Sequence, residues 1–171
     1  QELNAYEASK NLIKLMNRRY NLVLTHGNGP QVGNILMANT AGNKLYGLPD
    51  MPLDISVAYS QGFIAYLLEQ QLRNVLMEND LDQDVISIIT QVLVNKDDTA
   101  FLNPTKPIGP YFTKEEAEKF MKESNSVFKE DKARGGWRKV VASPEPLVIF
   151  NMRSIEKIAG EGHIAIAVGG G

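Results

Sequence analysis

A short apolar segment that leads into a glycine loop and then into a helix constrains this chain more than any other feature. Residues 21–24 read as a short apolar strand, residues 25–29 form the loop, and Pro30 suits the first turn of the helix that follows. Gly27 and Gly29 allow unusual backbone angles and close approach of another group. The start of the helix offers unpaired N–H groups and the positive end of its dipole. This combination is typical of an anion site, and the alternative is an ordinary strand-to-helix turn.

Two common classes of nucleotide-binding loop do not fit this segment. The P-loop pattern G-x-x-x-x-G-K-[ST] is absent from the sequence. The dinucleotide pattern G-x-G-x-x-G fails by one residue, because Gly33 follows Gly29 by four positions. No strand-ending acidic residue follows at the expected distance, since Asp50 lies in a proline-containing loop. These departures disfavour both a Walker-type NTPase and a Rossmann dehydrogenase.

Apolar spacing elsewhere predicts strands that alternate with helices, the pattern of an α/β domain with a mostly parallel sheet. The expected helices span residues 2–19, 31–41, 53–79, 114–123 and 153–159, and the expected strands span 21–24, 85–94, 137–141, 147–150 and 163–168. Residues 42–52 contain two glycines and two prolines, and they read as a loop.

The stretch from about residue 95 to residue 146 has a different character, because it is more polar and rich in proline. We interpret it as an inserted subdomain or flap. Within it, Thr113 and Glu116 form a capping box that predicts the start of a helix. The segment 103–110 contains three prolines and reads as a stiff loop that carries Lys106. Such a loop would hold a lysine ready for an anion, although residue types alone favour a solvated surface lysine.

Composition limits the remaining possibilities. The chain has 171 residues, a length suited to one domain or one lobe of something larger. A net charge of −2 argues against a dedicated nucleic-acid binder, and the lack of cysteine removes thiolate chemistry and Cys-ligated metals. His26 and His163 are the only histidines and lack ligand spacing, so we expect no metal site made of protein groups. No apolar run reaches the roughly 20 residues of a membrane span, and no export signal is evident, so we expect a cytoplasmic enzyme without a membrane partner.

The two ends of the chain suggest that more of the protein exists. The sequence begins at Gln1 within a helical pattern, and it ends at Gly169-Gly170-Gly171 directly after an expected buried strand. A glycine run at that place normally turns into another element, and we therefore expect a fragment or missing residues. The run would lie at the same sheet edge as the loop containing Gly27 and Gly29, so the two glycine loops could line one pocket.

Several ordered motifs together resemble the carbamate kinases of the amino acid kinase family, and the resemblance covers nearly the whole chain. The residues that carry it are Thr25 to Gly33, Met51 to Asp54, Ser60 to Gly62, Gln91 to Val94, Asn103 to Pro110, Trp137 to Val141 with Ser143-Pro144, and Gly169 to Gly171. The family's first glycine loop would lie before Gln1, and its nucleotide-binding lobe would follow Gly171. The stretch Ala133 to Gly136 has one residue more than the family pattern, which puts a role for Arg134 in doubt.

The resemblance implies a three-layer αβα fold with a mostly parallel sheet and a small protruding subdomain. Residues 1–94 and 147–171 would form a substrate-binding N-terminal lobe, and residues 95–146 would form the protruding subdomain. The C-terminal nucleotide-binding lobe would be absent from this chain. The implied assembly is a homodimer.

The resemblance also implies a reaction and a set of site residues. The reaction is reversible phosphoryl transfer between ATP and carbamate, which gives ADP and carbamoyl phosphate and belongs to arginine metabolism. Mg²⁺ would be carried by the nucleotide. By the same resemblance Lys106 is catalytic, and the substrate-binding residues are Gly27, Asn28, Gly29, Gly169 and Gly170. The alternatives are another acyl-phosphate-forming kinase of the same fold, or a non-catalytic module for anion binding or dimerisation.

Overall fold

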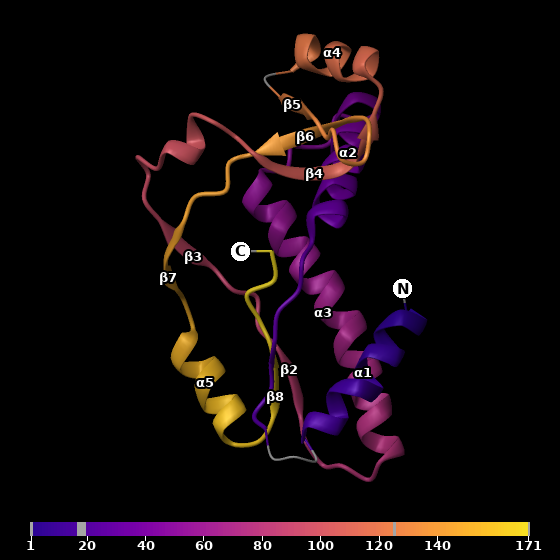
Figure 1. The fold of residues 1–171 in the computed structure, drawn as a ribbon, viewed down its shortest axis with the longest axis vertical. Coiled ribbons are helices and arrows are strands. Elements are labelled where there is room, and N and C mark those ends of the chain that lie inside the picture. Colours follow the sequence, from indigo (N-terminus) through magenta and orange to yellow (C-terminus); the bar gives the residue numbers. More distant parts are fainter. Residues whose placement is uncertain (1, 17–19, 125, 171) are drawn as a thin grey trace. The chain divides into compact units, whose positions relative to one another are not determined.

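The computed structural model describes residues 2–16, 20–124 and 126–170 (Figure 1). It divides into two compact units. Unit 1 consists of Gln1–Asn28, Ala58–Val92 and Ile149–Gly171, and unit 2 consists of Gly29–Val57 and Leu93–Val148. Each unit has its own sheet, so each can be understood from its own packing.

Unit 1 is built on a parallel sheet with the strand order β1-β8-β2. Its strands are β1 (Val23–Leu24), β8 (Ile164–Ile166) and β2 (Val85–Ser87). The central strand β8 is parallel to both neighbours, with Ala165 opposite Val23 on one side and Ile86 on the other. Because parallel strands need crossover connections, this sheet is expected to be covered on both faces.

The side chains of β8 and its next residue alternate between two helical layers. Ile164 and Ile166 pack into a core with α1 (Glu2–Met16) and α3 (Leu53–Glu78). Ala165 and Ala167 face the other way and pack with Ile155 of α5 (Met152–Gly160). Figure 1 shows α5 on one side of β8 and β2 and the helices α1 and α3 on the other. This helix–sheet–helix arrangement confirms the predicted α/β fold.

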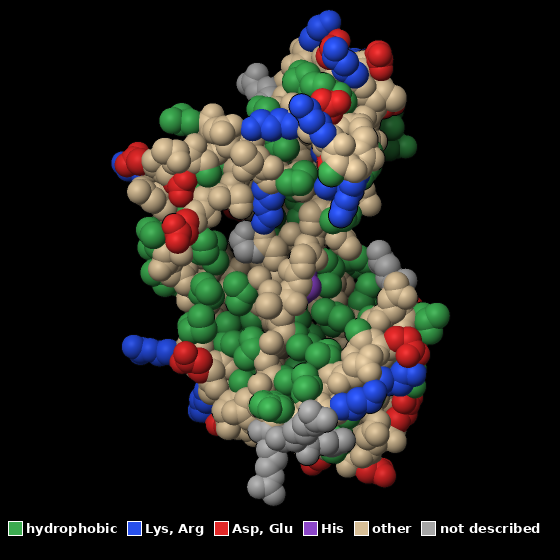
Figure 2. All heavy atoms as spheres, viewed as in Figure 1, with side chains coloured by type: hydrophobic (Ala, Val, Ile, Leu, Met, Phe, Trp, Pro, Cys, Tyr) green, Lys and Arg blue, Asp and Glu red, His purple; other side chains and the backbone are tan. Residues whose placement is uncertain are grey.

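Unit 2 contains a three-stranded antiparallel sheet with the order β4-β6-β5. The strands are β4 (Lys106–Phe112), β5 (Val127–Glu130) and β6 (Trp137–Val141), and the helices are α2 (Gly29–Tyr46) and α4 (Lys114–Glu123). The ring centroids of Phe112, Phe120 and Phe128 lie 5.3–5.9 Å apart. The contacts among these three rings hold α4 onto the sheet. In Figure 2, Lys and Arg side chains gather over α4 and the neighbouring strands.

Two shorter elements complete the fold. The strands β3 (Val92–Val94) and β7 (Pro146–Ile149) pair with each other, and η1 (Thr99–Phe101) is a single 3₁₀ turn. The side chain of Asp98 caps η1 by accepting a hydrogen bond from the backbone N–H of Ala100, and it also accepts one from Glu145. Asp98 therefore stabilises this turn through its hydrogen bonds.

Local signals located several elements correctly. The predicted helix 114–123 coincides with α4, and both hydrogen bonds of the Thr113–Glu116 capping box are present. The predicted helix 53–79 and strand 137–141 correspond to α3 and β6. The helix predicted over residues 2–19 is α1, and its last predicted residues, 17–19, lie outside the described residues.

The predicted end of the second helix was wrong. The helix α2 continues through Gly42 to Tyr46 instead of ending at residue 41. Gly47 follows it with a φ of +66°, and its N–H donates to the carbonyl of Asn43. A left-handed glycine just after the last turn is a common helix terminator, so Gly47 ends the helix within the segment 42–52 that was predicted as a loop.

The single strand predicted over residues 85–94 is in fact two strands, β2 and β3. Between them Thr90 leaves the sheet and pairs with a side chain of α3. Its N–H donates to Oε1 of Gln61 at 2.8 Å, and its carbonyl accepts from Nε2 of Gln61 at 3.1 Å. The buried amide of Gln61 thus provides hydrogen-bond partners for the backbone N–H and carbonyl of Thr90, where β2 no longer pairs with the sheet.

The stretch 103–110 was predicted as a stiff loop, but most of it belongs to β4. Pro107 and Pro110 lie within this strand. Prolines are tolerated because β4 is an edge strand, where one side of the backbone needs no ladder partner. Lys106 is therefore the first residue of a strand and is not held by a proline loop. The strand β5 was not predicted at all.

Candidate functional site

Three loops leave the carboxyl ends of the parallel strands of unit 1, and the loop after β8 is hydrogen-bonded to the other two. The loop after β8 donates from Val168 N–H to Oγ1 of Thr90, which follows β2, at 3.0 Å. The same loop donates from Gly170 N–H to the carbonyl of His26, which follows β1, at 3.0 Å. Ligands in open α/β sheets bind at this edge. The structure therefore has a cluster of loops, joined by hydrogen bonds, at the sheet edge where a ligand is expected.

Gly169 and Gly170 lie in close contact with the loop after β1. A Cβ atom on Gly169 would overlap the imidazole ring of His26. Gly170 has a φ of +78°, and a Cβ atom on it would overlap the side-chain amide of Asn28. The structure thus brings four predicted substrate-binding residues, Gly27, Asn28, Gly169 and Gly170, into one loop cluster.

Asn28 is a buried polar residue in this cluster, with only 3% of its surface exposed. Its Nδ2 donates to Oγ of Ser60 at 2.7 Å. Ser60 and its neighbour Gln61 are buried on α3. Neither was predicted as a site residue, although both belong to the helix motif 60–62. Two consecutive polar residues in the otherwise mainly apolar stretch 57–68 of this helix were the signal that could have identified them.

His26 lies partly buried beside these loops. Its Nδ1 is 3.4 Å from the carbonyl oxygen of Gly27. Burial lowers the pKa of the imidazole, and the nearby carbonyl opposes this shift in part. The folded structure therefore favours the neutral form of His26.

The lowered pKa of His26 predicts how stability depends on pH. The unfolded chain, with an ordinary imidazole pKa near 6.5, binds this proton more tightly than the folded chain does. Stability should therefore fall as the pH drops below about 6.5, until the lower pKa of the folded state is passed. We expect urea unfolding to show a larger loss between pH 7.5 and pH 5 for the wild type than for His26→Gln. Equal losses would contradict the assignment.

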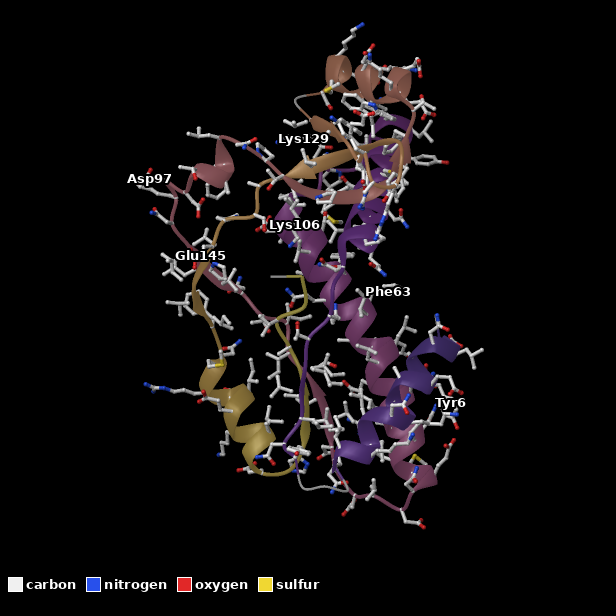
Figure 3. The ribbon with its side chains drawn as sticks, viewed as in Figure 1. Tyr6, Phe63, Asp97, Lys106, Lys129 and Glu145 are labelled. Atoms are coloured by element: carbon white, nitrogen blue, oxygen red, sulfur yellow. The ribbon has the colours of Figure 1, made fainter. Side chains whose placement is uncertain are left out.

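Unit 2 holds the other two predicted site residues, Gly29 and Lys106. Gly29 is the first residue of α2, and a Cβ atom on it would lie 3.3 Å from the carbonyl oxygen of Pro107. Pro107 directly follows Lys106, whose side chain leaves the start of β4 (Figure 3). The structure therefore places the N-terminus of α2 beside the strand that carries the lysine.

A second close contact packs α2 directly against β4. A Cβ atom on Gly33 would overlap the backbone N and Cα of Gly109. The carbonyl of Gly109 accepts a hydrogen bond from Nη2 of Arg138 at 2.8 Å, and the guanidinium lies 5.1 Å from the ring centroid of Tyr111. Arg138 therefore supports the strand that begins at Lys106.

Neither a metal cluster nor a membrane segment is found in the described part of the chain. Residues 2–16, 20–124 and 126–170 contain no group of three or more His, Asp or Glu side chains placed to hold a metal ion. Over the same residues, no helix combines the length and apolar content that crossing a bilayer requires.

The chain shows strong similarity to sequences named as carbamate kinases. It is 45% identical over 168 residues to a carbamate kinase of Pyrococcus horikoshii, a match that covers 98% of the chain and 53% of the relative. It is 46% identical over 164 residues to carbamate kinase 2 of Staphylococcus epidermidis, with 95% and 52% covered. The chain is homologous to about half of a carbamate kinase. No family model matches the sequence.

Solved structures agree with this relationship. A carbamate kinase from Giardia lamblia bound to citric acid superposes with a TM-score of 0.93 at 39% identity, covering 100% of the chain and 54% of that protein. The same enzyme bound to AMP-PNP gives a TM-score of 0.83 at the same identity and coverage. The resemblance to carbamate kinases inferred from the sequence motifs is thus confirmed. The chain spans about half the length of the curated relatives it matches.

Proposed function

We propose that this chain is the substrate-binding part of a carbamate kinase. The whole protein would transfer a phosphoryl group reversibly between ATP and carbamate, with ADP and carbamoyl phosphate as the other pair. The single observation that supports this most strongly is the loop cluster of Gly27, Asn28, Gly169 and Gly170, found in a chain 43–46% identical to carbamate kinases. We also propose that the nucleotide is bound by residues outside this chain.

The proposed roles follow from the chemistry of phosphoryl transfer. A carbamate oxygen attacks the γ-phosphorus of ATP, and the bond from that phosphorus to the β,γ-bridging oxygen breaks, so ADP leaves. Catalysis depends on positioning and on stabilising the charge spread over the phosphoryl oxygens. Backbone N–H groups of residues 27–29 would donate hydrogen bonds to these oxygens, and Gly169 and Gly170 would line the carbamate side. Lys106 would supply a positive charge.

The remaining parts of the proposal concern cofactor, assembly and setting. Mg²⁺ would enter with the nucleotide, bound chiefly through the nucleotide phosphates. The protein would act as a homodimer in the cytoplasm and take part in arginine metabolism.

An assay of ATP formation from ADP tests the proposed activity. The whole protein should form ATP from carbamoyl phosphate and much less from acetyl phosphate, and the 171-residue chain alone should form none. Preference for acetyl phosphate would support a different acyl-phosphate kinase. Robust turnover by the chain alone would refute the proposed location of the nucleotide site.

Binding measurements distinguish the enzyme from a non-catalytic module. By isothermal titration, the chain alone should bind carbamoyl phosphate and not ADP. If the whole protein also bound carbamoyl phosphate but ignored ADP, it would be an anion-binding module and the proposed kinase activity would be wrong.

A further inference from the structure

Unit 2 contains a hollow of about 580 Å³ that is lined mainly by apolar side chains. It lies between α2, the sheet β4-β6-β5 and α4, and its lining includes Met37, Ile108, Phe112 and Phe128. This volume is within the range of small-molecule sites, which are mostly apolar with a few polar groups that orient the ligand. None of the residues 27, 28, 169 or 170 lines it.

One charged side chain, that of Lys139, belongs to the mainly apolar lining of this hollow. Lys139 is in the central strand β6, directly opposite Ile108 of β4 and Phe128 of β5. Residues directly opposite each other in antiparallel strands project to the same face, so the lysine stands in a row between two buried apolar side chains. All three line the hollow.

Among the residues that the structure describes, no acidic side chain forms an ion pair with Lys139. Of the four charged residues that line the hollow, Lys44 and Glu123 pair with each other at 3.4 Å, and Asp50 is exposed. In the segments 20–124 and 126–170, Lys139 is half-buried and has no carboxylate within ion-pair distance. Burial alone lowers the pKa of its ammonium group, in agreement with this arrangement.

We propose that this hollow is a binding site for a small monocarboxylate with an apolar, preferably aromatic, body. The carboxylate would pair with the Nζ ammonium of Lys139, because an ion pair with a charged hydrogen bond offsets the cost of burying a lone lysine. The body would lie against the phenylalanine rings, whose edges and faces favour an aromatic partner. The hollow is lined by none of the residues proposed for phosphoryl transfer, so its test does not depend on turnover.

Phenylacetate and 2-phenylethanol are suitable probes, since they share the ring and differ in charge. Titration of the ¹⁵N-labelled protein should give saturable amide shifts at residues such as Gly33, Thr40 and Gly109. Phenylacetate should bind at least about 10-fold more tightly than 2-phenylethanol, the effect of one charge-assisted contact. Equal affinity would overturn the proposed role of the lysine, and it would show that the side chain simply extends its head into water. No saturable binding of either probe would overturn the site.

Variants of two lysines in neighbouring strands make the test specific. Lys139→Met keeps the unbranched chain and removes the charge, so it should weaken phenylacetate binding about 10-fold and leave 2-phenylethanol unchanged. Lys129→Met is the matched control, because Lys129 (labelled in Figure 3) lies in β5 opposite Arg138, donates to Asn103 and does not line the hollow. Unchanged phenylacetate binding by Lys139→Met, or equal weakening by both variants, would overturn the proposal. If Lys139→Met did not fold, Lys139→Arg should keep the preference for phenylacetate, and its loss would count against the site.

Discussion

Replacing Lys106 with alanine in the whole protein should lower kcat for ATP formation from carbamoyl phosphate by about 100-fold or more. The reason is that the substitution would remove a positive charge that faces the transferred phosphoryl group, and one such contact is worth about 3 kcal/mol in a preorganised site. The coupled assay at saturating ADP measures this directly. Lys106→Arg should recover part of the activity, since it restores the charge with a different shape.

Lys129→Ala is the control for this experiment. Lys129 is a lysine of the same sheet whose side chain donates to Asn103, and we expect it to leave kcat nearly unchanged. Thermal unfolding of both variants should show that the fold is retained. If Lys106→Ala worked at nearly the normal rate, Lys106 would be an ordinary surface residue and its proposed catalytic role would be wrong.

Gly33→Ala should destabilise the protein strongly, although alanine is the better helix former. The new Cβ would overlap backbone atoms of Gly109, and a backbone contact cannot be relieved by a side-chain rotation. Overpacking of this kind costs about 3 kcal/mol, which exceeds the gain of about 1 kcal/mol in helix propensity. Urea unfolding measures the difference, and the variant should also lose activity because β4 begins at Lys106.

Gly62→Ala is the matched control in another helix. Its nearest neighbour would be Cδ1 of Ile89 at 3.8 Å, an ordinary contact. This variant should therefore be neutral or more stable by up to about 1 kcal/mol. Equal effects of the two substitutions would show that the contact of α2 with β4 does not restrict residue 33.

Structures set by local sequence were predictable, and structures set by distant contacts were not. The helix α4 was located because Thr113 and Glu116 satisfy its first N–H groups within four residues. The break after β2 depends on the Gln61 amide, which is 29 positions away from Thr90. Likewise, prolines at 107 and 110 indicate a loop until the edge position of β4 is known.

The candidate site shows the same division. The glycine loop after β1 indicated an anion site, and the parallel sheet predicted that the loop after β8 would lie nearby. The contacts that make the cluster compact were not predictable from spacing, because they join Asn28 to Ser60 and Gly169 to His26. The proposed ligand rests on the sequence similarity to carbamate kinases, because the packing alone does not specify it.

The most direct test of the central claim is a crystal structure of the whole protein with carbamoyl phosphate bound. We predict that the phosphoryl oxygens accept hydrogen bonds from backbone N–H groups of residues 27–29, with Gly169 and Gly170 beside the carbamoyl group. If the ligand instead occupied another part of the protein and the loop after β1 faced only solvent, the proposed function of this loop cluster would be contradicted.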